Sequence, residues 1–274
     1  MENVTLSEEP IIIPPAGEPP AFTAHWGGWR VFGIFVLCAV VFVIGQFVVA
    51  LLVIKNSPYL TKMLFHVRLG SPAEQLAFYK ALLTAPVIFW TEFVSDAGLV
   101  GCLLLVGKFA LDITPRALGL RVPQLGAVGI GVLGGLACLV LGEAMGLIQS
   151  RLLGEHPQVT AVILASHRGA MSFALDLLAV SVIAPIAEEI FFRGFLFTAF
   201  LQRLPLSLSA ILSGVIFGLG HGDLWNALPL AAIGVVLAYV YRRTGNLWSN
   251  VIAHSMNNGI TLALAFAFPE LVKH

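Results

Sequence analysis

Two adjacent glutamates and an arginine, Glu188, Glu189 and Arg193, lie where one apolar segment of the chain runs into another. Charged side chains are costly at membrane depth, so this group indicates a functional site. On a helix, Glu189 and Arg193 share a face and can pair, whereas Glu188 is rotated by about 100°. We therefore favour Glu188 as a general base and the other two residues as its support. The sequence alone does not decide which glutamate is the base.

Two further apolar segments each carry a histidine with a partner four residues away. Phe217 and His221 occupy one helix face, and a histidine near a carboxylate could orient or deprotonate water. His254 and Asn258 also share a face, and such a pair of hydrogen-bond donors suits the oxyanion of a tetrahedral intermediate. Together with the charged group, these residues supply the side chains of a hydrolytic site.

The composition is that of a membrane protein. Of the 274 residues, 58% are hydrophobic and only 11% are charged, and the mean hydropathy is +0.92. Because soluble domains usually carry about a quarter charged residues, we expect a multi-pass integral protein in contact with the lipid bilayer. The net charge of zero gives no indication of nucleic-acid binding. The expected location is the plasma membrane of a bacterium.

The apolar segments predict an all-α fold, a polytopic transmembrane helix bundle of about seven or eight spans. The segments that predict them are 31–54, 85–107, 122–149, 172–188 with its continuation 190–201, 206–221, 224–241 and 247–269. Gly131 and Gly135 form a small-xxx-small pair that lets helices approach closely. We divide the chain into a mobile proline-rich tail, N-terminal membrane helices with their loops, and a helical catalytic core, over residues 1–29, 30–170 and 171–269.

The N-terminal part contains two further local signals. Ser71 and Glu74 form a capping box that predicts a helix start, and Pro86 is expected to break or kink the helix that follows. Glu92 and Asp96 share one helix face. They form either a polar stripe that faces protein or a support for the site.

The three motifs resemble those of the CPBP intramembrane proteases, which include the type II CAAX prenyl endopeptidases and many bacterial abortive-infection-like proteins. The chain has Glu-Glu-xxx-Arg at 188–193, Phe-xxx-His at 217–221 and His-xxx-Asn at 254–258, in that order. The resemblance covers about 170–262. The segment 117–121, Ala-Leu-Gly-Leu-Arg, is also similar to one that these proteins often carry upstream.

This resemblance implies a glutamate-dependent endopeptidase that needs no cofactor. Its substrate would be a peptide or a lipidated protein within the membrane. Carried over to this chain, the resemblance assigns water activation to Glu188 and His221. It assigns the oxyanion site to His254 and Asn258, and a stabilising role to the remaining glutamate and arginine.

Other interpretations of the same residues stay open. Two carboxylates and two histidines could hold zinc, although the chain lacks a His-Glu-xx-His motif and Arg193 would repel a metal cation. The ionisable groups could instead form a structural ion network or the relay of a proton-linked transporter. A non-catalytic immunity or interaction protein is a further alternative.

Overall fold

The computed structural model describes residues 26–67, 70–154, 156 and 158–269. Residues 1–25 of the predicted tail therefore lie outside the described residues. Residues 28 and 29, which were also predicted to belong to the tail, are part of the first helix. The described part of the chain contains helices and no strand, which confirms the all-α prediction. The helices are α1 (Gly28–Lys55), α2 (Pro58–Val67), α3 (Pro72–Leu82), α4 (Ala85–Leu111), α5 (Leu125–Leu153), α6 (Val159–Leu164), α7 (Ala170–Leu178), η1 (Ala179–Ile183), α8 (Ala184–Glu189), η2 (Ile190–Phe197), α9 (Thr198–Leu201), α10 (Leu206–Gly220), α11 (Ala227–Thr244) and α12 (Leu247–Ala267).

Four helices in the described residues are long and apolar enough to cross a membrane. They are α1, α4, α5 and the continuous helix Ala170–Leu201. α10 is apolar but has only 15 residues, and α11 and α12 occupy the positions of the last two predicted spans without meeting this criterion. The protein is thus a multi-pass integral membrane protein with a helical bundle fold.

The helix Ala170–Leu201 carries the glutamate pair and is irregular on both sides of it. It contains two π-helical stretches, η1 before the pair and η2 directly after it. Pro185, in the first turn of α8, has no amide hydrogen to donate, and the π stretch immediately before it lets the helix continue. Such π turns are frequent at functional sites.

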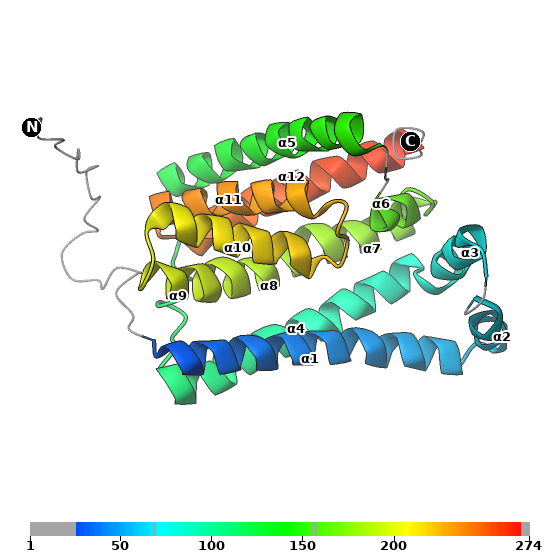
Figure 1. The fold of residues 1–274 in the computed structure, drawn as a ribbon, viewed down its shortest axis with the longest axis horizontal. Helices are drawn as coiled ribbons and strands as arrows, with labels where there is room; N and C mark the ends of the chain where they lie inside the picture. Colours follow the sequence, from blue (N-terminus) through cyan, green and yellow to red (C-terminus); the bar gives the residue numbers. More distant parts are fainter. Residues whose placement is uncertain (1–25, 68–69, 155, 157, 270–274) are drawn as a thin grey trace, which may run out of the picture.

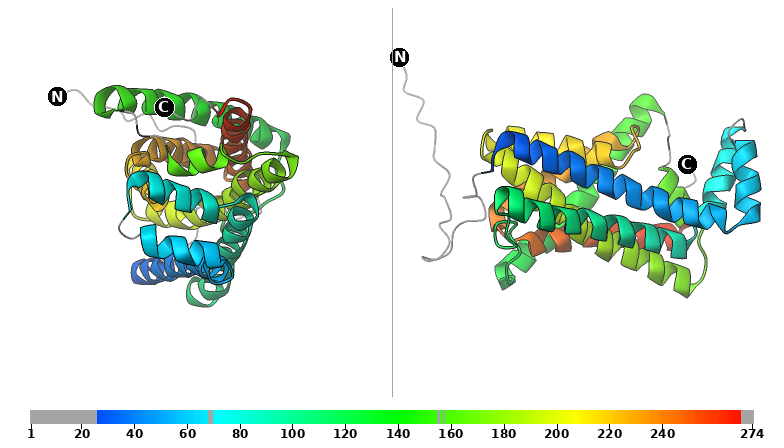
Figure 2. Two further views of the ribbon diagram at one scale, coloured as in Figure 1. Left: turned by 90° about the vertical axis from the view of Figure 1, so that its right-hand side faces the viewer. Right: turned by 90° about the horizontal axis from the view of Figure 1, so that it is seen from below.

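The helices pack as two groups with the glutamate helix between them (Figure 1). α1 packs against α4, while α5 packs against α11 and α12 and α10 packs against α11. The views in Figure 2 show α1 and α4 running side by side along the length of the bundle. The segments that carry Glu188, His221 and His254 therefore belong to neighbouring helices.

Small residues bring α5 close to α12, as the Gly131–Gly135 pair predicts. A Cβ atom at Gly131 would lie 2.6 Å from the carbonyl oxygen of Ser249, and one at Gly135 would lie 3.0 Å from that of Ala253. The backbones can approach this closely only because both positions are glycine. This contact holds the stretch of α12 that precedes His254.

The predicted helix start at Ser71 is present as a capping box. The Ser71 side chain accepts from the Glu74 amide, and the Glu74 carboxylate accepts from the Ser71 amide. The helix ends before Pro86, which occupies the first turn of α4. α3 and α4 are consequently separate helices joined at Leu83 and Thr84.

His167, in the connection between α6 and α7, contacts both the α3–α4 connection and the glutamate helix. Its Nδ1 atom is 2.7 Å from Oδ2 of Asp176 in α7, and its Nε2 atom is 3.0 Å from the carbonyl oxygen of Leu83. Both partners are acceptors, so only the protonated imidazolium can donate to both. The hydrogen bond to Asp176 accordingly raises the pKa of His167 above its usual value of 6.5.

We expect His167→Gln to lower the thermal unfolding midpoint at acidic pH and to have little effect at alkaline pH. Because the folded-state pKa of His167 is raised above 6.5, its contribution is complete below that pH and is lost as the pH rises through the folded-state pKa. Unfolding of the purified protein in detergent from about pH 5 to pH 8 measures this.

His156→Gln is the matched control, because the His156 ring stacks on Trp225 and has no acidic partner within the described residues. A loss of stability in His167→Gln that is the same at every pH would contradict the protonated contact.

Candidate active site

The predicted pair of Glu189 and Arg193 is present and fully buried. Nη1 of Arg193 donates to Oε1 of Glu189 at 2.8 Å, and neither side chain is exposed. Nη2 of Arg193 donates to the carbonyl oxygen of Gly234 in α11 at 3.0 Å. The guanidinium carbon also lies 4.5 Å from the centre of the Phe217 ring, in cation–π contact. The charge of Arg193 is thus compensated from three helices.

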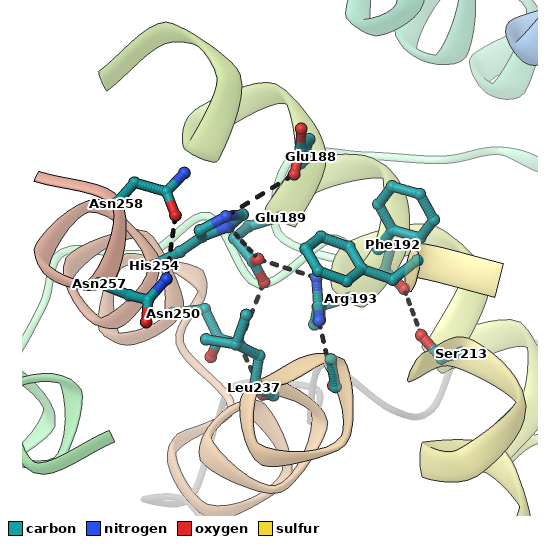
Figure 3. A network of polar contacts seen from close by, with 12 residues as sticks. Glu188, Glu189, Phe192, Arg193, Ser213, Leu237, Asn250, His254, Asn257 and Asn258 are labelled. Carbon is teal, nitrogen blue, oxygen red and sulfur yellow. Dashed lines mark hydrogen bonds and ion pairs between the residues drawn. The ribbon is translucent and has the colours of Figure 1, made fainter. Parts of the chain in front are cut away.

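Two residues of α12 complete the environment of Glu189 (Figure 3). Nδ1 of His254 is 2.9 Å from Oε1 of Glu189, and Nδ2 of Asn250 donates to Oε2 at 3.2 Å. Asn250 also donates to the carbonyl oxygen of Leu237 at 2.6 Å. Both oxygens of Glu189 therefore accept hydrogen bonds, and this carboxylate helps to hold the helices together.

Asn250 was not among the residues predicted for the site. It is a fully buried amide in an apolar helix, four residues before His254 and so on the same face. A search for polar residues at helical spacing from His254 in both directions would have found it.

Glu188 has a different environment from its neighbour. Its side chain is 21% exposed, and its Oε2 atom has no hydrogen-bond partner within the described residues. Oε2 lies 3.8 Å from Nε2 of His254, which is too long for a hydrogen bond but close enough for electrostatic attraction. The predicted division between one engaged and one available carboxylate is present in this geometry.

His254 lies between the two glutamates, as Figure 3 shows. The Glu189 carboxylate accepts from Nδ1, which orients the ring and directs Nε2 toward Glu188. Sequence reasoning grouped Glu188 with His221 instead. In the structure, His254 is the histidine that lies nearest to Glu188.

His221 caps the C-terminal end of α10 and is exposed. Its Nδ1 atom donates to the carbonyl oxygen of Phe217 at 2.8 Å, which leaves Nε2 available. The Phe217 ring contacts both imidazoles, with centroid distances of 4.8 Å to His221 and 5.6 Å to His254. Phe217 thus links the two histidines without direct contact between them.

Asn258 holds an irregular part of the glutamate helix. In η1 the amide of Ala184 bonds to the carbonyl oxygen of Ala179, five residues back. The same pattern would pair the carbonyl of Val180 with Pro185, which has no amide hydrogen. Nδ2 of Asn258 donates to this carbonyl at 2.8 Å and takes the place of the missing donor. One of the two side-chain amide hydrogens of Asn258 is therefore used in a hydrogen bond to the backbone.

Glu92 and Asp96 face the site from α4, which packs against α8 and η1. Their carboxylates lie within electrostatic range of Glu188. Asp96 is only 2% exposed, and neither of its oxygens has a hydrogen-bond partner in the described part of the chain. Asp96 therefore faces protein, as the first interpretation of this stripe expects, and a supporting role at the site stays a prediction.

The side chains around His254 differ from those of a zinc site. No group of three or more His, Cys, Asp or Glu side chains within the described residues is arranged to hold a metal ion. Glu189, the carboxylate nearest His254, is bound to Arg193. A guanidinium at that position repels a cation, so these residues do not fit zinc.

The fold and the site define a helical membrane protein with an arginine-paired glutamate, an available glutamate and two histidines. Residues 170–260 match the family described as type II CAAX prenyl endopeptidase Rce1-like. This match confirms the resemblance that the three motifs indicate. The match covers about a third of the chain.

Individual relatives agree with this result. YdiL of Bacillus subtilis, whose name marks it as a candidate membrane peptidase, is 38% identical over 78 residues, which are 28% of this chain and 32% of YdiL. The uncharacterized protein YyaK of the same organism is 36% identical over 102 residues, or 32% of this chain and 34% of YyaK. The membrane-embedded CAAX protease MroQ of Staphylococcus aureus is 18% identical over 246 residues, or 86% of this chain and 91% of MroQ.

The chain thus spans about a third of the length of the first two of these relatives. No solved structure matches the chain.

We expect Glu189→Gln and Arg193→Gln each to destabilise the fold by roughly 3–5 kcal/mol, because each leaves an uncompensated buried charge. The double variant should lose less than the sum of the two, since it leaves no lone charge. Denaturant unfolding in mixed micelles measures all three free energies. Glu143→Gln, at an exposed position of α5, is the control and should change little. Additive losses would show that the two residues do not act as a pair.

Proposed function

We propose that this protein is an intramembrane endopeptidase that uses Glu188 to activate water against a peptide bond. The observation that supports this most is the difference between the two glutamates. Glu189 is buried with both oxygens engaged, while Glu188 is partly exposed and has an oxygen without a hydrogen-bond partner in the described residues. A general base must keep a free acceptor for the proton it removes.

His254 is proposed to stabilise the oxyanion. The Glu189 carboxylate holds Nδ1, so Nε2 is directed to the place where Glu188 would deliver the nucleophile. Because Nδ1 donates to Glu189, Nε2 can donate to the oxyanion only when the ring is the doubly protonated imidazolium. In that form, a donor fixed in advance near the reacting carbonyl stabilises the developing negative charge without reorganisation. Asn258 has one further amide hydrogen that could join it, because only one is used by Val180.

His221 is proposed as the second water-activating group, as the family resemblance implies. Its Nε2 atom is free to accept a proton because Nδ1 donates to Phe217. The shared Phe217 ring places it on the same side of the bundle as His254. The attacking water would lie between His221 and Glu188.

The proposed substrate is a membrane-associated or prenylated peptide. The name of MroQ describes that relative as a CAAX protease, and the matched family is that of CAAX prenyl endopeptidases. Access from the bilayer is consistent with a site built within helices that lie in the membrane.

Glu188→Gln is expected to lower the turnover number by at least about 100-fold while the thermal unfolding midpoint stays near that of the wild type. The glutamine amide cannot accept the proton. The fold should stay stable because Glu188 is partly exposed and lies outside the buried ion pair. Cleavage of a fluorogenic prenylated CAAX peptide by purified protein measures turnover.

Glu143→Gln serves as the control for a lost negative charge. Wild-type cleavage that persists in Glu188→Gln would exclude Glu188 as the base. Loss of wild-type cleavage in the presence of a chelator would favour a metal mechanism. No cleavage by the wild type would reject this peptide class as the substrate.

His221→Ala should lower turnover by about 100-fold to 10,000-fold, the usual range for a general acid or base. Because His221 is exposed and bonded only within its own helix turn, stability should change little. His156→Ala, in another loop, is the control. Full activity in His221→Ala would exclude His221 as a water-activating group and leave Glu188 in that role.

A proton-linked transporter is the second candidate, since Glu92, Asp96 and Glu188 form a chain of carboxylates across neighbouring helices. Proton flux in proteoliposomes that Asp96→Asn abolishes would favour it over hydrolysis. A non-catalytic immunity or interaction protein would show neither flux nor cleavage and would tolerate Glu188→Gln.

A further inference from the structure

A cavity of about 620 Å³ lies at one end of α1 and α4, apart from the candidate active site. Residues from the start of α1 and the end of α4 line it, namely Gly27, Arg30, Lys108, Phe109, Ala110, Leu111 and Asp112. Its volume falls in the range of small-molecule sites, about 300–1,000 Å³. Both helices are candidate spans that begin or end here, at the same end of the bundle (Figure 1). The cavity therefore opens at the boundary between the bilayer and water.

The charged groups of the cavity favour an anion. Arg30 and Lys108 provide two cations and Asp112 one carboxylate, which leaves one net positive charge. Nη1 of Arg30 donates to the carbonyl oxygen of Ala110 at 3.1 Å, and its other guanidinium hydrogens remain available. Lys108 has no hydrogen-bond or ion-pair partner within the described part of the chain. The guanidinium of Arg203 lies beside Gly28, close to the same end of α1.

The surroundings of the cavity are those of a lipid-facing surface. Trp29 is 87% exposed, Phe109 is 81% exposed and Phe32 is 58% exposed, all on the helix turns that carry the cations. Aromatic side chains gather at membrane interfaces, and basic pockets between transmembrane helices bind phospholipid headgroups. A soluble anion would gain nothing from these three rings, whereas a phospholipid would place its acyl chains against them.

We propose that this cavity binds the headgroup of an anionic glycerophospholipid, with its phosphate between Arg30 and Lys108 and its acyl chains along Phe32 and Phe109. The two cations then do more than anchor the ends of their helices at the interface. They form a site for one lipid molecule at the joint between α1 and α4. This inference does not depend on the proposed peptidase activity.

The test is lipid binding to the purified full-length protein in detergent, measured by native mass spectrometry. Phosphatidylglycerol, phosphatidylcholine and inorganic phosphate are the three probes. The variant is Arg30→Gln with Lys108→Gln. The control is Lys55→Gln with Arg151→Gln, which removes two equally exposed cations from the last turns of α1 and α5, away from the cavity.

Wild type and control should bind phosphatidylglycerol equally, and better than phosphatidylcholine. The cavity variant should bind phosphatidylglycerol about 25-fold more weakly, because each cation near an anionic lipid contributes about fivefold. All three proteins should have the same unfolding midpoint without lipid. Equal binding by the cavity variant, or equal binding of both lipids by the wild type, would overturn the proposal. Displacement of phosphatidylglycerol by inorganic phosphate would show a site for soluble anions instead.

Discussion

The buried ion pair of Glu189 and Arg193 is the interaction on which the arrangement of the site depends. Two charges inside a bundle are costly unless hydrogen bonds and opposite charge compensate them. Here the Phe217 ring from α10, the Gly234 carbonyl from α11 and Asn250 and His254 from α12 supply those contacts. Meeting the needs of one ion pair therefore brings four helices to fixed positions. Glu188, one residue earlier, is not hydrogen-bonded into that network: its Oε2 atom lies 3.8 Å from Nε2 of His254 and has no hydrogen-bond partner in the described residues.

The irregular course of the glutamate helix belongs to the same arrangement. A regular α-helix through Pro185 would lose a backbone hydrogen bond, and the π stretch before it leaves the Val180 carbonyl without a donor. Asn258 supplies that donor, so α12 is fixed to the helix both at the ion pair and at Val180, nine residues earlier. This double attachment holds His254 between the two glutamates. A residue predicted as an oxyanion donor thus also has a positioning role that follows from a proline.

Much of this could be predicted from the sequence where a local rule applies. The Glu189–Arg193 pair follows from a spacing of four, and the capping box at Ser71 and the break before Pro86 follow from local backbone chemistry. The grouping of Glu188 with His254 could not be predicted, because it depends on which faces of α8 and α12 meet. Asn250 was missed for the same reason. Its spacing of four from His254 marks it as a candidate on the same face, but its partner lies 61 residues away, and that pairing depends on how the two helices meet.

We propose that the two adjacent glutamates have different roles because only Glu189 is held in an ion pair. Carbodiimide-activated coupling of a small amine to the folded protein, followed by peptide mapping with mass spectrometry, tests it most directly. It reports which carboxylate is accessible and unengaged, whatever the substrate. Glu188 should be modified, and Glu189 should be protected until the protein unfolds. Modification of Glu189 in the folded protein, or protection of both residues, would contradict it.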